Sequence, residues 1–349
     1  MNRSIDSRIR TLRRWLDSKK VPKTFIRMSD FQVQIRDQLV AAIRLGQLGV
    51  EANSCPVCGR TDGDIVSTSE RMGIPLSTAF CRGCPSMYST TRFDSDSMSA
   101  FYSNWYRKLS TGREEPGVAF REMQAAAGQS LLTFLSGIGV LKNSFSRVLD
   151  VGCGAGGTLE PFAGIGFDCV GIDLDSTYLE GGERTGIQLE NVRLEDFRSD
   201  KSFDLVILDD VIEHLAVPSI GIMGVRSLLS DDGLVACQVP VLNTLRELGY
   251  RNDLRRYFQL AHVNHFSITG LSVLFARAGM GLVAFDGVGQ FVFRANHNIK
   301  EFADVDLLAS RDSLLSHLTR VTKLRSYYSA RESVASRVPV GLRSIGRIK

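Results

Sequence analysis

Three glycines, Gly152, Gly154 and Gly156, follow a short apolar run at residues 147–151. An apolar run that ends in glycines predicts a buried strand that turns sharply into a helix. Glycine lets the backbone turn tightly and approach a ligand, whose polar groups then meet free N–H groups at the start of the helix. The spacing therefore predicts a site for a nucleotide-type ligand.

The acidic residues around this turn indicate which ligand it would hold. Asp150, at the strand end beside the glycines, would repel a pyrophosphate but suits the cationic amino group of S-adenosylmethionine (SAM). A second apolar run closes on Asp173, about 20 residues further on, where folds of this kind hold a ribose diol. Glycine spacing alone would also fit a nicotinamide-binding turn, so it is Asp150 that favours SAM.

Together these residues resemble the class I SAM-dependent methyltransferases, over about residues 145–295. The resemblance implies an α/β fold with a doubly wound, mostly parallel, Rossmann-like sheet of seven strands. It also implies that residues 202–210 form the fourth strand and that an acid after the third strand contacts the adenine. The cofactor-binding residues it implies are Asp150, Gly152, Gly154, Gly156, Asp173, Glu195, Asp196 and Asp209.

Four of the seven cysteines form two C-x-x-C pairs, Cys55 with Cys58 and Cys81 with Cys84. Two such knuckles on tight turns can bring four thiolates around one tetrahedral zinc ion, with no open position for a substrate. We therefore predict a structural Zn²⁺ site. Redox-active or unliganded thiols are the alternative.

Methyl transfer to a hydroxyl needs a base, because a free hydroxyl is a weak nucleophile at neutral pH. Histidine, with an unperturbed pKa of about 6.5, is the natural candidate. Three of the five histidines, His214, His262 and His265, flank the expected acceptor site. We predict His265 as the first candidate for the base and His214 as the second, with Glu213 as a further catalytic residue. Packing roles for Glu213 and His214 are the alternative.

The same residues resemble the metal ligands of the small-RNA 3′-terminal 2′-O-methyltransferases. That resemblance implies a Mg²⁺ site made of Asp210, Glu213, His214 and His265. Asp210 stands where that family has a glutamate. Many methyltransferases carry a Glu-His pair without a metal, so the resemblance is partial.

Alternating strand and helix signals position these residues, as a doubly wound sheet requires. Amphipathic helices are predicted around residues 5–16 and 33–43, an aromatic helix from Asp94, and a longer helix from Pro116 to about Gly137. Beyond Asp173 the predicted strands cover residues 191–194, 202–210, 233–240, 282–285 and 291–293, with a helix at 271–278.

A longer connection, residues 241–267, follows the fifth predicted strand. It interleaves Tyr250 and Tyr257 with four arginines at 246, 251, 255 and 256. Ligands bind beyond the carboxyl ends of strands in such sheets, so this connection is placed to cover the methyl acceptor. Arginine side chains suit phosphate because they donate two parallel hydrogen bonds. A helix with a solvated basic face would give the same residue pattern and is the alternative.

The composition is that of a globular protein, with 44% hydrophobic and 23% charged residues among 349. No apolar run reaches the length of a membrane span, and the N-terminus lacks the apolar core of a signal peptide, which predicts a cytoplasmic protein. The net charge of +4 is concentrated at the ends: residues 1–50 hold 11 basic and 4 acidic side chains, and residues 311–349 hold 9 and 2. Solvated helix faces or an anionic partner such as nucleic acid would explain this.

The cysteine module and the aromatic helix, with Phe101–Tyr102 and Tyr106–Arg107, resemble a group of bacterial methyltransferases tied to sugar and surface-polysaccharide pathways. Pro85 stands where that group has glycine. The resemblance implies O-methylation of a sugar, nucleotide sugar or glycan; the alternatives are an RNA methyltransferase, a sugar C-methyltransferase and a SAM-binding scaffold. The predicted parts are basic helices (1–50), a zinc module (51–92), aromatic and linking helices (93–145), a SAM-binding domain (146–300) and a basic helical tail (301–349).

Overall fold

The computed structural model describes residues 24–114, 117–176 and 187–335. The helix predicted around residues 5–16 lies outside the described residues. The larger of the two main layers is a seven-stranded sheet with the order β12-β13-β10-β9-β6-β7-β8. Its strands are β6 (Arg147–Val151), β7 (Asp168–Asp173), β8 (Gln188–Asn191), β9 (Phe203–Asp209), β10 (Leu229–Gln238), β12 (Met280–Phe285) and β13 (Gln290–Ala295).

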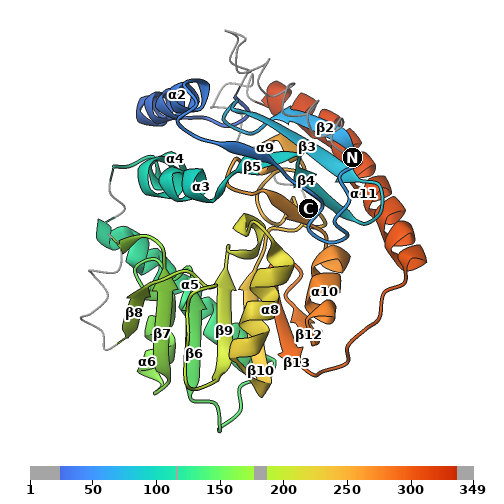
Figure 1. The fold of residues 1–349 in the computed structure, drawn as a ribbon. Helices are drawn as coiled ribbons and strands as arrows, with labels where there is room; N and C mark the ends of the chain where they lie inside the picture. Colours follow the sequence, from blue (N-terminus) through green and yellow to red (C-terminus); the bar gives the residue numbers. More distant parts are fainter. Residues whose placement is uncertain (1–23, 115–116, 177–186, 336–349) are drawn as a thin grey trace.

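Strand pairing in this sheet is parallel from β10 through β9, β6 and β7 to β8, and antiparallel at β13. Helices cover both faces, as Figure 1 shows with α8 in front of the sheet and α5 behind it. This is the predicted doubly wound, mostly parallel α/β fold. The covering helices are α5 (Gly117–Gly137), α6 (Glu160–Gly164), α8 (Pro218–Leu228) and α10 (Ile268–Arg277).

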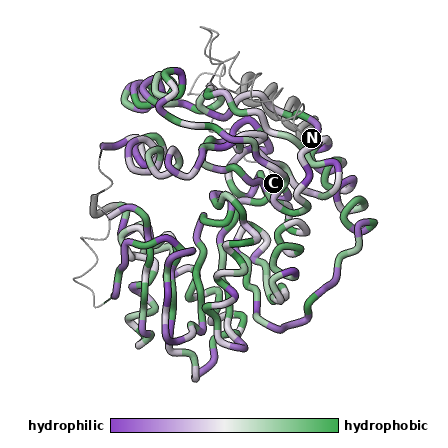
Figure 2. Tube along the Cα trace, in the orientation of Figure 1, coloured by the Kyte–Doolittle hydropathy of each residue, from purple (hydrophilic) through white to green (hydrophobic). Residues whose placement is uncertain are grey.

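Central strand β9 shows why the sheet has helices on both sides. Its residues alternate between two apolar clusters, because successive side chains of a strand point to opposite faces. Leu205 and Ile207 pack in the cluster that contains α5, whereas Val206 and Leu208 pack in the cluster that contains α8 and α10. In Figure 2 the central strands are largely hydrophobic, while edge strand β8 is hydrophilic.

A second layer holds the cysteine module above the carboxyl ends of the large sheet. Its four-stranded sheet has the order β11-β4-β3-β2, and α11 (Asp304–Ala335) runs along it (Figure 1). A short pair, β1 (Val50–Ala52) with β5 (Thr91–Phe93), lies beside it. The four strands are β2 (Gly63–Ser69), β3 (Pro75–Cys81), β4 (Ser86–Ser89) and β11 (Asn264–Phe266).

The predicted helices of the N-terminal half are present with their caps. Ser29 and Gln32 form a capping box at the start of α2 (Asp30–Arg44). The side chain of Asp94 accepts a hydrogen bond from Ser97 N and starts α3 (Ser95–Phe101), which continues through a π-helical segment at Tyr102–Tyr106 into α4 (Arg107–Thr111). Among the described residues, no helix is long and apolar enough to span a bilayer.

The structure differs from the predicted pattern of strands and helices in three places. The third strand of the domain is Gln188–Asn191 rather than residues 191–194. Glu213 and His214 lie in a one-turn 3-10 helix, Ile212–His214, because Pro218 begins the following α8 only after an extended segment. Finally, part of the 241–267 connection pairs with the cysteine module: β11 is antiparallel to β4.

Candidate functional site

The three glycines form the predicted turn at the carboxyl end of β6. Gly152, Gly154 and Gly156 have φ angles of +75°, +53° and +74°, a region that side chains other than glycine rarely adopt. Gly154 N donates a hydrogen bond of 2.8 Å to Asp173 Oδ2, and Asp175 N donates one of 2.8 Å to Asp173 Oδ1. Each carboxylate oxygen of Asp173 keeps a lone pair for a ligand hydroxyl.

Gln124 of α5 holds the same turn from its other side. Its Nε2 donates to Cys153 O at 2.9 Å, and its Oε1 accepts from Ala155 N at 3.2 Å. A Cβ added to Gly154 would lie 2.8 Å from Gln124 Nε2, so only glycine fits at this approach. Gln124 could not be predicted from the sequence, because its partners lie about 30 residues away and are backbone atoms.

Acidic side chains gather at the strand ends beside the turn. Asp150 is 1% exposed, and burial, followed by the charges of Asp209 and Asp173, raises the pKa of its carboxyl. Burial also raises the pKa of Asp209. Carboxyl groups crowded in this way are stabilised in their charged form by a nearby cation. SAM carries two cationic groups, an ammonium and a sulfonium, so these residues fit it.

Glu195 and Asp196 are exposed in the turn after β8. Because the strand ends three residues earlier than predicted, Asn191 is the residue beside Asp173, and its Nδ2 donates to Asp173 O at 2.9 Å. The adenine-binding roles of Glu195 and Asp196 stay predictions.

A second polar group, which we call the histidine cluster, consists of Glu213, His214 and His262. Their ligand-capable atoms all lie within 4.8 Å of one another. His262 Nε2 is 3.8 Å from Glu213 Oε1, and the rings of His214 and His262 meet edge to face at 4.6 Å. Glu213 is 1% exposed, and neither of its carboxylate oxygens has a hydrogen-bond partner among the described residues. A buried carboxylate left in this state marks a functional site.

Residues from three elements hold the histidine cluster in place. Asn264 of β11 donates from Nδ2 to Leu215 O at 2.7 Å and to Glu213 O at 3.3 Å, which fixes the 3-10 turn. Tyr102 Oη lies 2.8 Å from His214 Nδ1. Tyr102 belongs to the π-helical segment, a distortion frequent at functional sites. Gln259 Nε2 lies 2.6 Å from His262 Nε2.

Burial keeps both imidazoles of the cluster neutral. It lowers the pKa of His262, with further lowering from His214, His265 and Arg71. Burial and the charge of Arg107 lower the pKa of His214 to about 3, although a hydrogen bond with the backbone of Ala261 partly raises it. The Gln259 amide lies 3.0 Å from His262 Nδ1 as well as 2.6 Å from Nε2, so it contacts the nitrogen edge of the ring. A neutral imidazole has one nitrogen that can receive a proton.

The pKa values of Glu213 and of its neighbour Asp210 are raised. Burial and then Asp210 raise the pKa of Glu213. Asp210 is itself accessible, yet the surrounding protein raises its pKa to about 7, with Asp209 adding to the effect. Asp210 also has a φ of +52°, so its backbone is held in a strained region beside the cluster.

His265 does not join the histidine cluster. It lies on β11, fully buried, with its ring 5.2 Å from that of Tyr257 and 5.0 Å from that of Phe258. Neither ring nitrogen has a hydrogen-bond partner among the described residues, and burial lowers its pKa to about 3. The structure therefore places His262, and not His265, beside Glu213 and His214, which also changes the ligand set expected for Mg²⁺.

The four predicted zinc ligands do come together. Cys55 Sγ is 3.3 Å from Cys84 Sγ, Cys58 Sγ is 3.4 Å from Cys81 Sγ, and all four sulfurs lie within 4.8 Å of one another. Four thiolates around zinc at about 2.3 Å would be about 3.8 Å apart, so the cluster fits a tetrahedral ion. Gly83 N donates to Cys81 Sγ at 3.3 Å, and Gly59 closes the other knuckle at a φ of +71°.

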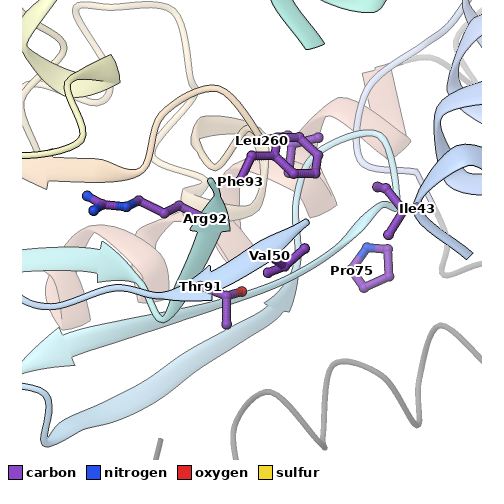
Figure 3. Close-up of a pocket in the computed structure, with 7 residues that line it drawn as sticks. All are labelled: Ile43, Val50, Pro75, Thr91, Arg92, Phe93 and Leu260. Atoms are coloured by element: carbon purple, nitrogen blue, oxygen red, sulfur yellow. The ribbon is translucent and has the colours of Figure 1, made fainter. Parts of the chain in front are cut away.

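The connection at 241–267 covers the site less directly than expected. Tyr257 is buried and donates from Oη to Pro240 O at 2.7 Å, and Arg255 pairs with Asp253 at 3.1 Å. A separate apolar pocket in the upper layer appears in Figure 3. Its single charged lining residue, Arg92, points away from it and pairs with Glu51 at 2.7 Å. This pocket carries no chemistry.

Comparison with known proteins agrees with this geometry. Residues 119–284 match the family model described as a methyltransferase domain. The chain contains a methyltransferase domain. This match supports the predicted SAM-dependent methyltransferase fold, and the matched residues include the glycine turn, Asp173 and the histidine cluster.

Ubiquinone biosynthesis O-methyltransferases are among the relatives of the methyltransferase domain. The protein of Cereibacter sphaeroides is 35% identical over 98 residues, 26% of this chain and 40% of that protein. The protein of Rhodopseudomonas palustris is 31% identical over 103 residues, 28% of this chain and 40% of that protein. The chain thus spans two fifths of the length of these relatives. The solved magnesium protoporphyrin IX methyltransferase of Synechocystis is 16% identical with a TM-score of 0.42, over 58% of this chain and 98% of that one.

Proposed function

We propose that the protein transfers the methyl group of SAM to a hydroxyl oxygen of a small-molecule acceptor. The observation that carries this proposal is the Glu213–His262 pair, a buried carboxylate without a hydrogen bond that lies 3.8 Å from a neutral imidazole. Proton removal from an alcohol needs such a group, and the pair lies in the methyltransferase domain that holds the glycine turn.

The cofactor would be held by the residues at the ends of β6, β7 and β9. Asp173 would accept hydrogen bonds from the ribose hydroxyls, the glycine turn would approach the methionine part, and Asp150 would face the ammonium. SAM supplies an electrophilic methyl group on a sulfonium. What the protein then contributes is alignment of the acceptor oxygen with that methyl group and removal of the hydroxyl proton.

In the proposed reaction the acceptor oxygen forms a bond to the methyl carbon while the carbon–sulfur bond breaks, and S-adenosylhomocysteine (SAH) leaves with the bonding pair. The hydroxyl proton moves to the neutral His262 imidazole, and Glu213, whose Oε1 lies 3.8 Å from Nε2, stabilises the imidazolium that forms. We assign this role to His262 instead of His265, because His265 packs between aromatic rings. His214, bound to Tyr102, would position the His262 ring.

We propose a sugar, nucleotide sugar or glycan as the acceptor, as the resemblance of the cysteine module and aromatic helix implies. Tyr102 and Tyr106 support this proposal, since both rings contact His214, at 6.1 and 5.8 Å between centroids, and aromatic faces suit a sugar ring. The O-methyltransferase names of the relatives support transfer to oxygen rather than to carbon.

A structural zinc ion in the four-cysteine cluster is part of the same proposal. It would tie the knuckle at Cys55–Cys58 to the end of β3 at Cys81. Because β11 pairs with β4 of this module, an intact module would also hold Asn264 and, through it, the turn that carries Glu213.

The experiment is incubation with methyl-labelled SAM and separate pools of nucleotide sugars, glycans, phenolic small molecules and RNA. We expect label in an alkali-stable methyl ether of a small molecule. Label in RNA or on a sugar carbon would replace the acceptor proposed here. A rate that collapses with a chelator of hard cations, with zinc occupancy intact, would favour a metal at the histidine cluster over proton transfer to His262.

A further inference from the structure

Arg71 carries a positive charge that no described residue neutralises by contact. Its Nε is shielded from solvent and has no hydrogen-bond partner, and no described residue forms a hydrogen bond or ion pair with its guanidinium. A buried donor without an acceptor is costly, and a charged one more so. Arg71 as a whole is half-buried, so the rest of its guanidinium can reach an anionic ligand that completes its hydrogen bonds.

The turn that presents Arg71 is rigid. It joins β2 to β3, and Glu70 Oε1 accepts hydrogen bonds from Met72 N at 2.7 Å and Ile74 N at 2.9 Å. Arg71 N donates to Phe258 O at 2.9 Å, so the turn is also tied to the connection that leads to His262. Because the backbone is fixed before binding, little order is lost when a ligand contacts the guanidinium.

Arg71 lies on the acceptor side of the site. It lines a pocket together with Glu70, Tyr106 and Gln259. Tyr106 contacts His214, and Gln259 contacts His262. Burial raises the pKa values of Tyr250 and Tyr106, and the charge of Arg71 lowers them. Burial and Arg71 both lower the pKa of His262, so the guanidinium acts on all three residues.

Neighbouring charges do not satisfy Arg71. The Glu70 carboxylate uses Oε1 for its own turn, and burial raises its pKa to about 7. Arg36, the other cation near Glu70, is paired with Asp37 at 2.7 Å. Glu70 lines the same pocket and Arg71 lowers its pKa against burial, so it is a nearby acid, yet it forms no hydrogen bond or ion pair with the Arg71 guanidinium.

We propose that Arg71 binds an anionic oxygen group, phosphate or carboxylate, on the methyl acceptor. A guanidinium fork suits both groups, because it donates two parallel hydrogen bonds. This inference rests on the proposed function and narrows it: the acceptor carries an anion on the side of the reacting hydroxyl that faces Arg71, as a nucleotide sugar or a sugar acid does.

The test is calorimetric titration of sodium phosphate, and separately sodium acetate, into the protein saturated with SAH. We compare the wild type with Arg71→Gln, Arg71→Lys and the control Arg27→Gln, an exposed arginine in the same half of the chain. We expect at least one anion to bind the wild type and the control alike, about 10–100-fold more weakly to Arg71→Gln, and with an intermediate loss to Arg71→Lys, which keeps the charge without the fork.

Equal binding of both anions by the wild type and Arg71→Gln, or binding of neither by the wild type, would overturn the inference. The SAH titration that precedes each experiment separates the two proposals. Failure of SAH to bind contradicts the proposed function itself, whereas SAH binding without anion binding contradicts the role of Arg71 alone. With an identified acceptor, Arg71→Gln should raise KM and leave SAM affinity unchanged.

Discussion

Replacement of Asp173 by alanine tests the cofactor assignment through one side chain. Asp173 accepts hydrogen bonds from Gly154 N and Asp175 N, both at 2.8 Å. Asp173→Ala therefore removes the carboxylate that would accept the ribose hydroxyls and also releases the glycine turn. Loss of hydrogen bonds to a charged acceptor costs about 1.5–3 kcal/mol, so we expect SAH to bind about 10–150-fold more weakly.

The assay is calorimetric titration of SAH, and the matched control is Asp168→Ala. Asp168 begins the same strand, β7, at its far end, where it pairs with Arg147 at 2.8 Å. The control should lose some stability and keep its SAH affinity. Asp173→Asn, which keeps one oxygen acceptor, should fall between the two alanine variants. A folded Asp173→Ala variant with wild-type affinity for SAH would refute the reasoning.

Three further predictions concern the module and the histidines. Metal analysis of protein purified without chelator should give one zinc per chain, and Cys81→Ser should loosen residues 50–90 in hydrogen exchange before the methyltransferase domain; a zinc-free, equally protected wild type would contradict this. His262→Ala should lower the methylation rate by about 10²–10⁴-fold with SAM affinity retained, whereas His265→Ala should mainly lower stability; full activity of His262→Ala would exclude it as the base. The pKa values of His265 and His214 are lowered to about 3, so both residues bind fewer protons in the folded than in the unfolded protein. The free energy of unfolding should therefore fall as the pH drops below about 6.5, by up to about 1.4 kcal/mol per pH unit for each histidine. In urea titrations, His265→Leu should make the free energy of unfolding less dependent on pH.

The features that can be predicted from the sequence are those that depend on residues close together in the chain. The strand, the glycine turn and Asp173 can be predicted because apolar periodicity and positive φ angles act over a few residues. The cysteine pairs also specify their own turns. The seven-stranded sheet and the cluster of four sulfurs follow from these local signals, and the structure bears them out.

The histidine cluster could not be predicted in full, because it depends on long-range pairing. Strand β11 pairs with β4, about 180 residues earlier, and alternation along β11 turns His265 toward Tyr257 and Phe258 while Asn264 faces the turn of Glu213. His262 precedes the strand and reaches Glu213. Gln124 and Arg71 could not be predicted for the same reason. Gln124 matters through backbone partners about 30 residues away, and Arg71 matters because its Nε has no hydrogen-bond partner among the described residues.

The most direct measurement is a crystal structure of the protein with SAH. The account predicts that Asp173 holds the ribose, that the ammonium lies beside Asp150, and that the sulfur faces the histidine cluster, with open space between it and the His262 ring for an acceptor hydroxyl. SAH bound elsewhere, or bound in the glycine turn with its sulfur directed away from Glu213 and His262, would contradict the claim that the cofactor site and the proton acceptor form one active site.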